Sequence, residues 1–183
     1  MVYTSGMTLA EAFDATVTAV RTDPGRAAVR LRVEGIALDG VATEVRAGRH
    51  TLIVDEPPSL GGQGQAANPV QIALAALASC QVVTYRFWAT RLGIRVDGLT
   101  VDAEGDLDQR GLLGLDDDVR PGFTAVRVTV RLSGPETPQR YAELREAVDA
   151  HCPLLDLFGN LTPVSTRLEP TRPEAADPPA TPP

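Results

Sequence analysis

The longest apolar segment of the chain, residues 68–93, reads NPVQIALAALASCQVVTYRFWATRLG. Asn68 is a strong helix N-cap, and Pro69 suits the first helical position because its missing N–H would have no partner there. Nothing between residues 70 and 92 breaks a helix, and Gly93 is typical of the position that follows a helix end. At about 1.5 Å per residue, the predicted helix is roughly 35 Å long. Its first turns are apolar on nearly all sides, so we expect it at the centre of the fold.

The region before this helix predicts one short helix and a meander of strands. Apolar residues recur at helical spacing over residues 7–20, and a turn at 23–25 ends that helix. Apolar and polar residues then alternate, which indicates half-buried strands. The glycine-rich loop 55–67 that follows lacks the pattern of a phosphate-binding loop. The predicted strands of this region are residues 27–35, 41–46 and 50–54.

The region after the long helix predicts further strands and one more helix. Strands and helices segregate along the chain instead of alternating, which favours an α+β fold with mainly antiparallel sheets. One chain's sheet can hardly cover a nonpolar helix of this length, so we expect a homodimer. Residues 1–168 are expected to form a single domain, and residues 169–183, of which six are proline, a disordered tail. The predicted elements here are strands at 96–105, 125–132 and 163–168 and a helix at 138–150.

Composition narrows the classes of partner. The net charge is -7, and all 17 positive residues are arginine. This balance argues against nucleic acid or an anionic membrane surface as partner, since both require a basic face. The first residues lack a basic start followed by an apolar core, and the most apolar window is shorter than the roughly 20 residues of a membrane span. We therefore expect a cytoplasmic protein, in which cysteines rarely serve as a static crosslink.

The two cysteines, Cys80 and Cys152, are the candidate reactive groups. Each has an ordinary alternative, since a free cysteine often packs as a small core residue. They could form a disulfide only if their Cα atoms approach within about 7 Å. Their spacing from His50 and His151 matches no zinc motif, and no serine-nucleophile motif occurs. We expect no metal and no cofactor. Three aromatic side chains of the long helix could line a pocket beside Cys80 or pack in the core: Tyr85, Phe87 and Trp88.

Several segments together resemble the OsmC/Ohr family, over about residues 9–168. Residues 55–80 resemble the loop and central helix of that family, ending in Leu74-Ala75-Ala76-Leu77-Ala78-Ser79-Cys80. Residues 105–122 resemble one OsmC-like branch, and Cys152-Pro153 resembles the second-cysteine region. The resemblance implies an intertwined homodimer whose long helices pack at its centre, with active sites at the subunit interface.

The resemblance also implies a thiol peroxidase that reduces organic hydroperoxides. Cys80 would attack the peroxide as a thiolate, Cys152 would form a disulfide with it, and an external dithiol reductant would restore both thiols. The alternative from another class is a non-catalytic OsmC-like protein that binds an apolar small molecule at the dimer interface. A third possibility is that both cysteines are structural.

Two positions depart from the peroxidases of the family. Those proteins carry Glu where this chain has Val70, and Arg near the strand end where it has Asp55 and Glu56. Arg46 or Arg49 could substitute for the missing cation. A buried thiol beside an acid and without a cation has a raised pKa. The sequence therefore predicts a poorly activated Cys80 unless one of these arginines lies near it.

Overall fold

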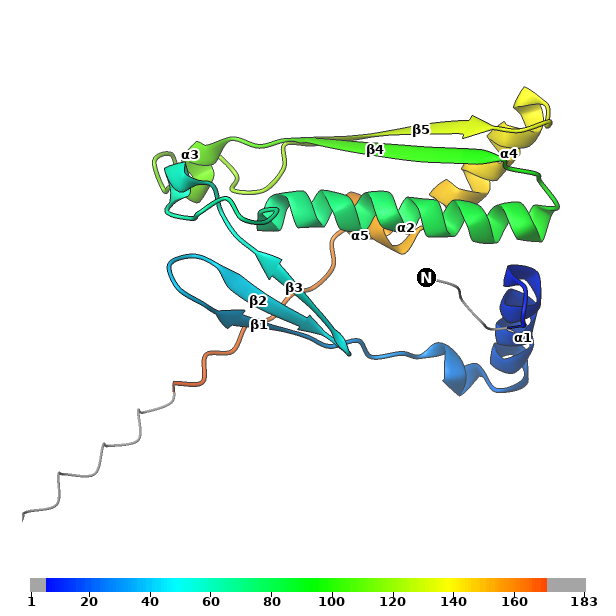
Figure 1. Ribbon diagram of the computed structural model, residues 1–183, viewed down its shortest axis with the longest axis horizontal. Helices are drawn as coiled ribbons and strands as arrows, with labels where there is room; N and C mark the ends of the chain where they lie inside the picture. The colour runs from blue at the N-terminus through cyan, green and yellow to red at the C-terminus, as the bar shows by residue number, and fades with distance from the viewer. Residues whose placement is uncertain (1–5, 171–183) are drawn as a thin grey trace, which may run out of the picture.

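The computed structural model describes residues 6–170, and Figure 1 shows its arrangement. The sheets are antiparallel, and the long helix lies along the β4–β5 pair, as an α+β fold with a central helix predicts. The helices are α1 (Leu9–Thr22), α2 (Pro69–Leu92), α3 (Gln109–Leu112), α4 (Pro138–Asp149) and α5 (Pro153–Gly159), with 3-10 turns at Pro24–Ala27 and Pro58–Leu60. The strands are β1 (Val33–Ala37), β2 (Thr43–Ala47), β3 (His50–Val54), β4 (Gly98–Asp106) and β5 (Ala125–Ser133).

Helix α2 begins and ends where the sequence predicts. The Asn68 side chain accepts from the backbone N–H of Gln71, and the Gln71 side chain accepts from the backbone N–H of Asn68, which satisfies two otherwise free donors. Gly93 ends the helix at φ +62°, a conformation that costs glycine little. Both ends of α2 are therefore determined locally.

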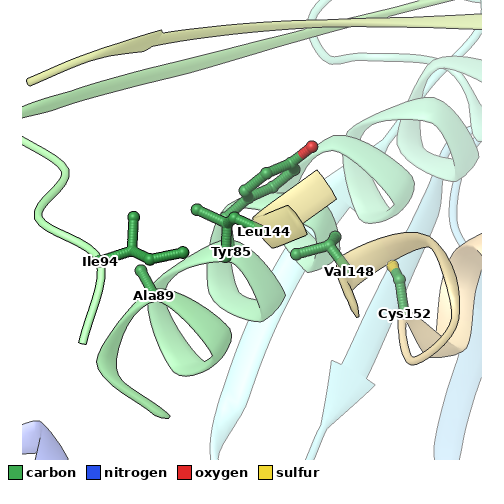
Figure 2. Close-up of a cluster of buried hydrophobic side chains, with 6 residues drawn as sticks. All are labelled: Tyr85, Ala89, Ile94, Leu144, Val148 and Cys152. Atoms are coloured by element: carbon green, nitrogen blue, oxygen red, sulfur yellow. The ribbon is translucent and has the colours of Figure 1, made fainter. Parts of the chain in front are cut away.

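A single buried cluster joins α2 to α4 and to the turn before α5. Figure 2 shows its side chains, with Cys152 at one end of the row. Leu144 and Val148 of α4 have no exposed surface, and they pack against Tyr85 and Ala89 of α2. Burial of these side chains orients the turn that carries Cys152.

Two predictions about secondary structure are wrong, and one helix was not predicted. The strand predicted at 27–35 begins only at Val33, which pairs with Ala47; β2 ends there, so residues 27–32 have no facing strand. The strand predicted at 163–168 is not formed: residues 160–170 have no regular structure, and Val164 is 83% exposed. A strand requires a neighbouring edge, and no strand pairs with this segment among the described residues. Residues 153–159, for which the sequence predicts no element, form the short helix α5. Of the predicted tail, all but Glu169 and Pro170 lies outside the described residues.

One chain buries little of its apolar surface. Among the described residues, eight apolar side chains are buried, whereas seventeen large apolar ones are exposed. The sheet β1–β2–β3 makes its main contacts within itself and lies apart from the β4–β5 pair, on the other side of α2 (Figure 1). Helix α2 has the length and composition of a membrane span, a test that the core helix of a soluble protein also passes. Exposed apolar surface of this extent is typical of interaction sites.

Candidate thiol pair

The fold brings the two cysteines together. Cys80 lies in the middle of α2, and Cys152 is the residue before α5, 72 positions further along the chain. Their Sγ atoms are 3.6 Å apart, which is longer than the roughly 2.05 Å of a disulfide bond, so both are free thiols in contact. Cys152 is only 2% exposed, whereas Cys80 is half-buried. A small movement is enough to join them.

The surroundings of Cys80 favour the protonated thiol over the thiolate. Burial raises the pKa of the Cys80 thiol, and the neighbouring Cys152 raises it further. The backbone N–H of Leu154 acts in the opposite direction, since a hydrogen bond to the sulfur favours the thiolate. Thr84, whose hydroxyl donates to the Cys80 carbonyl at 2.8 Å, also lowers the pKa. The net pKa of Cys80 is therefore above its ordinary value. The sequence predicts a raised pKa for Cys80. The causes, however, are burial and the second thiol, and not Asp55 or Glu56.

The arginines proposed as substitutes are engaged elsewhere. Arg46 lies on β2 and pairs with Glu44 at 2.7 Å and with Glu34 at 4.0 Å. Nε of Arg49 faces the ring of the adjacent His50 at 3.5 Å. Neither arginine affects the pKa of Cys80. Among residues 6–170, no arginine is one of the groups that shift the pKa of Cys80.

Asp55 organises the loop before α2. Its buried carboxylate accepts hydrogen bonds from the backbone N–H groups of Glu56, Gln63 and Gln65 at 2.9, 3.0 and 3.1 Å. The bond from Gln65 and the other backbone donors hold the pKa of Asp55 below its ordinary value, against the effect of burial. Beside it, Oε2 of Glu56 is buried without a hydrogen-bond partner in the part of the chain that the structure describes. Asp55 is therefore a structural acid of the loop.

Asp55→Ala is expected to lower the free energy of unfolding by about 1–3 kcal/mol, because three backbone N–H groups lose the carboxylate that accepts from them. Since the pKa of Asp55 is lowered in the folded protein, its contribution is present above the pKa of the unfolded chain and is lost as the pH falls through the folded value. Urea unfolding at pH 7 and pH 3 measures both effects. Asp117→Ala, at an exposed loop position, is the control; an equal loss in both variants would contradict this role.

A large apolar cavity begins one turn before Cys80. Its volume is about 940 Å³, and it lies between α2, the start of β5 and α5. Leu154, whose N–H contacts the Cys80 sulfur, is part of its wall, so the cavity adjoins the thiol pair. Arg120 is the charged residue of the lining. The lining is otherwise mostly apolar and includes Ala73, Ala76, Leu77, Val126, Leu157 and Phe158.

The aromatic residues of α2 do not line this cavity. Tyr85 is in the buried cluster, as the core-packing alternative predicts. Phe87 contacts Phe13 of α1 with ring centroids 5.5 Å apart. Trp88 lies 4.3 Å from the ring of His151, the neighbour of Cys152, with the Arg91 guanidinium 4.9 Å from the Trp88 ring.

Sequence reasoning missed three contributors to this region. Thr84 is one helical turn after Cys80, a spacing visible in the sequence. The N–H of Leu154 and the side chain of Arg120 come from distant segments, and no local pattern indicates their role. Among residues 6–170, no group of three or more histidine, cysteine or acidic side chains is arranged to hold a metal ion.

Comparison with known proteins identifies the fold. A solved OsmC-like protein from Mycoplasma pneumoniae is 14% identical, with a TM-score of 0.64 over 73% of this chain and 89% of that chain. Organic hydroperoxide resistance proteins from Legionella pneumophila and Elizabethkingia anophelis are 21% and 19% identical, with TM-scores of 0.54 and 0.55. Each alignment covers 71% of this chain, and 89% and 88% of the respective relative.

These identities establish a common fold and nothing finer. A comparison with curated protein sequences finds no match. The model of the family described as OsmC-like protein matches residues 62–167, more than half of the chain, and the matched segment contains Cys80 and Cys152. With its antiparallel sheets, its long helix and this match, the chain belongs to the OsmC-like protein family.

Proposed function

We propose that this protein is a cysteine-based thiol peroxidase that reduces organic hydroperoxides. The observation that carries the proposal is the contact of two free thiols, 3.6 Å apart, beside an apolar cavity of about 940 Å³. The names of the Legionella pneumophila and Elizabethkingia anophelis proteins, organic hydroperoxide resistance proteins, support the same chemistry. No cofactor is required, because the sulfurs supply both electrons.

The proposed cycle uses each cysteine once. The Cys80 thiolate attacks the terminal peroxide oxygen, the O–O bond breaks, and the alkoxide takes a proton to leave as an alcohol. The resulting Cys80 sulfenic acid is attacked by the Cys152 thiol, which forms a disulfide and releases water. An external dithiol then reduces the disulfide and is itself oxidised. The short Sγ–Sγ distance favours the second step, since the resolving thiol is already in place.

The raised pKa of Cys80 gives this cycle an alkaline pH dependence. The rate constant for oxidation of reduced protein by cumene hydroperoxide is expected to rise about tenfold per pH unit from pH 6 to 8, because the thiolate fraction rises in that proportion below the pKa. Single-turnover loss of free thiol measures the rate constant. A plateau below pH 7 would contradict the raised pKa and indicate an activating group that one chain lacks.

We also propose that the working unit is a soluble cytoplasmic homodimer. Residues Ala75, Ser79, Val83 and Phe87 form an exposed stripe along α2 at intervals of four. Ridges at this spacing pack closely against a second helix, and small residues allow a close approach. A second copy of α2 is the partner that the family resemblance predicts. Residues 1–168 form the domain in this proposal, and a second subunit could supply the cation that Cys80 lacks.

A second candidate function is the binding of an apolar small molecule without catalysis. The raised pKa of Cys80 favours it, because a protonated thiol is a poor nucleophile. The same cavity would then serve for storage or sensing. Steady-state consumption of cumene or t-butyl hydroperoxide with a dithiol donor separates the two candidates: the peroxidase requires Cys80, whereas apolar ligand binding survives its replacement.

A further inference from the structure

A second cavity, smaller and more polar, is lined in part by Cys152, a residue that is only 2% exposed. Its volume is about 380 Å³, and it lies at the turn between α4 and α5. Cys152 lines this cavity, which we call the Cys152 cavity, and Cys80 does not. The lining consists of Asp149, Ala150, His151, Cys152, Pro153, Leu155, Asp156 and Asn160.

The charged groups of the Cys152 cavity are mainly acidic. Asp149 has a partial counter-charge, since Nε of Arg145 lies 3.3 Å from its carboxylate and both side chains are substantially exposed. Asp156 has no arginine partner among the described ion pairs, and its carboxylate accepts from the side-chain amide of Asn160 at 2.8 Å. His151 is held by a 2.7 Å contact between Nδ1 and the carbonyl of Ala147. The chain as a whole has a net charge of -7.

We propose that the Cys152 cavity is the entrance for the external reductant, and that its acids select thiols without a nearby carboxylate. This inference rests on the proposed thiol–disulfide cycle. The reductant thiolate attacks Sγ of Cys152, the Cys80–Cys152 bond breaks, and Cys80 leaves as a thiolate. The second thiol of the reductant then attacks the mixed disulfide, which releases Cys152 as a thiolate and the reductant as a disulfide.

Charge matters here because the attacking species is already an anion. A thiolate that also carries a carboxylate approaches two acids with two negative charges, whereas an ammonium group cancels one of them. For an added charge at about 7 Å from one carboxylate in water, Coulomb's law predicts roughly a threefold change in rate. Two acids therefore change the rate about sevenfold for each unit of charge on the thiol. The physiological reductant in this view is a neutral or cationic dithiol.

The experiment compares three small thiols of matched size. Protein oxidised with diamide is reduced by cysteamine, 2-mercaptoethanol or 3-mercaptopropionate, and each rate constant is divided by the thiolate fraction. Trp88, the single tryptophan, lies against His151 beside Cys152, so its fluorescence should report the reduction in a stopped-flow experiment, with thiol titration as a check. Rates are expected to fall about 50-fold from the ammonium to the carboxylate thiol at low salt, because the two thiols differ by two unit charges, and this range should collapse at 1 M salt.

Variants distinguish an effect of the acids in the Cys152 cavity on the reduction rate from an effect of the net charge of the protein. Asp156→Asn and Asp149→Asn should each accelerate reduction by 3-mercaptopropionate about threefold. Asp117→Asn, which removes the same charge at an exposed loop position, should leave the three rates unchanged. Equal rates for the three thiols in the wild type, or equal responses of all variants, would overturn the inference. Because diamide forms the disulfide, failure of hydroperoxide turnover leaves this test intact and counts only against the peroxidase.

Discussion

Cys80→Ser is expected to lower hydroperoxide turnover by about 100-fold or more. Catalysis in the proposed cycle passes through the Cys80 thiolate, and a serine hydroxyl is neither ionised nor oxidised by a hydroperoxide under these conditions. The measurement is consumption of cumene hydroperoxide with a dithiol donor at pH 8, where the thiolate fraction is larger than at neutral pH. Unchanged turnover in this variant would exclude the peroxidase and leave the binding candidate.

Cys152→Ser is the matched control, because it removes one sulfur of the same 3.6 Å pair and leaves the attacking one. This variant should consume about one equivalent of hydroperoxide and stop as the Cys80 sulfenic acid, which dimedone traps as an adduct that mass spectrometry detects. Steady-state turnover without Cys152 would show that an external thiol resolves the intermediate. If the wild type itself consumes no hydroperoxide and either substitution unfolds the protein by circular dichroism, the cysteines are structural.

Ala75→Glu is expected to convert a dimer to monomers. In an isolated chain this exposed helix position would tolerate glutamate at little cost, since alanine and glutamate are both good helix formers. At a helix–helix contact, the substitution places an unpaired charge in a closely packed interface, which costs several kcal/mol. Light scattering after size exclusion should therefore give twice the subunit mass for the wild type and one subunit mass for the variant.

Ala142→Glu makes the same substitution at an exposed position of α4 and is the control for helix stability and charge. This control should remain dimeric. A wild type that is monomeric at micromolar concentration, or an Ala75→Glu protein that is as dimeric as the control, would contradict packing along the α2 stripe. If the dimer supplies a cation to Cys80, the monomeric variant should also lose hydroperoxide turnover.

The helices of this protein were predictable wherever their signals are local. Asn68, Pro69 and Gly93 define the two ends of α2, and Thr137 with Pro138 defines the start of α4. The two hairpin strands of residues 43–54 follow from alternation around the turn at Gly48. These features depend on backbone groups within a few residues of one another, so the sequence contains all the information they require.

Predictions failed where pairing depends on a distant partner. The residues before Val33 alternate as a strand should, yet β2 ends opposite Val33 and leaves them without a ladder. Val164 lies in a segment with strand-like composition and no neighbouring strand within the described chain. Alternation of apolar and polar residues indicates which face a strand would bury. Only the tertiary arrangement decides whether a neighbouring strand is present to pair with it.

The sequence by itself determined the central helix, the place of Cys80 on it and the family. The tertiary structure decided what surrounds that sulfur. Packing of Leu144 and Val148 against α2 brings Cys152 to 3.6 Å from Cys80, and burial raises the pKa of the thiol. The acids at 55 and 56, which the sequence suggests as neighbours of the thiol, are not the cause of its raised pKa, and Asp55 binds backbone N–H groups of its own loop. Helix ends follow from neighbouring residues, whereas a pKa follows from every group within a few ångströms, and those groups come from the whole chain.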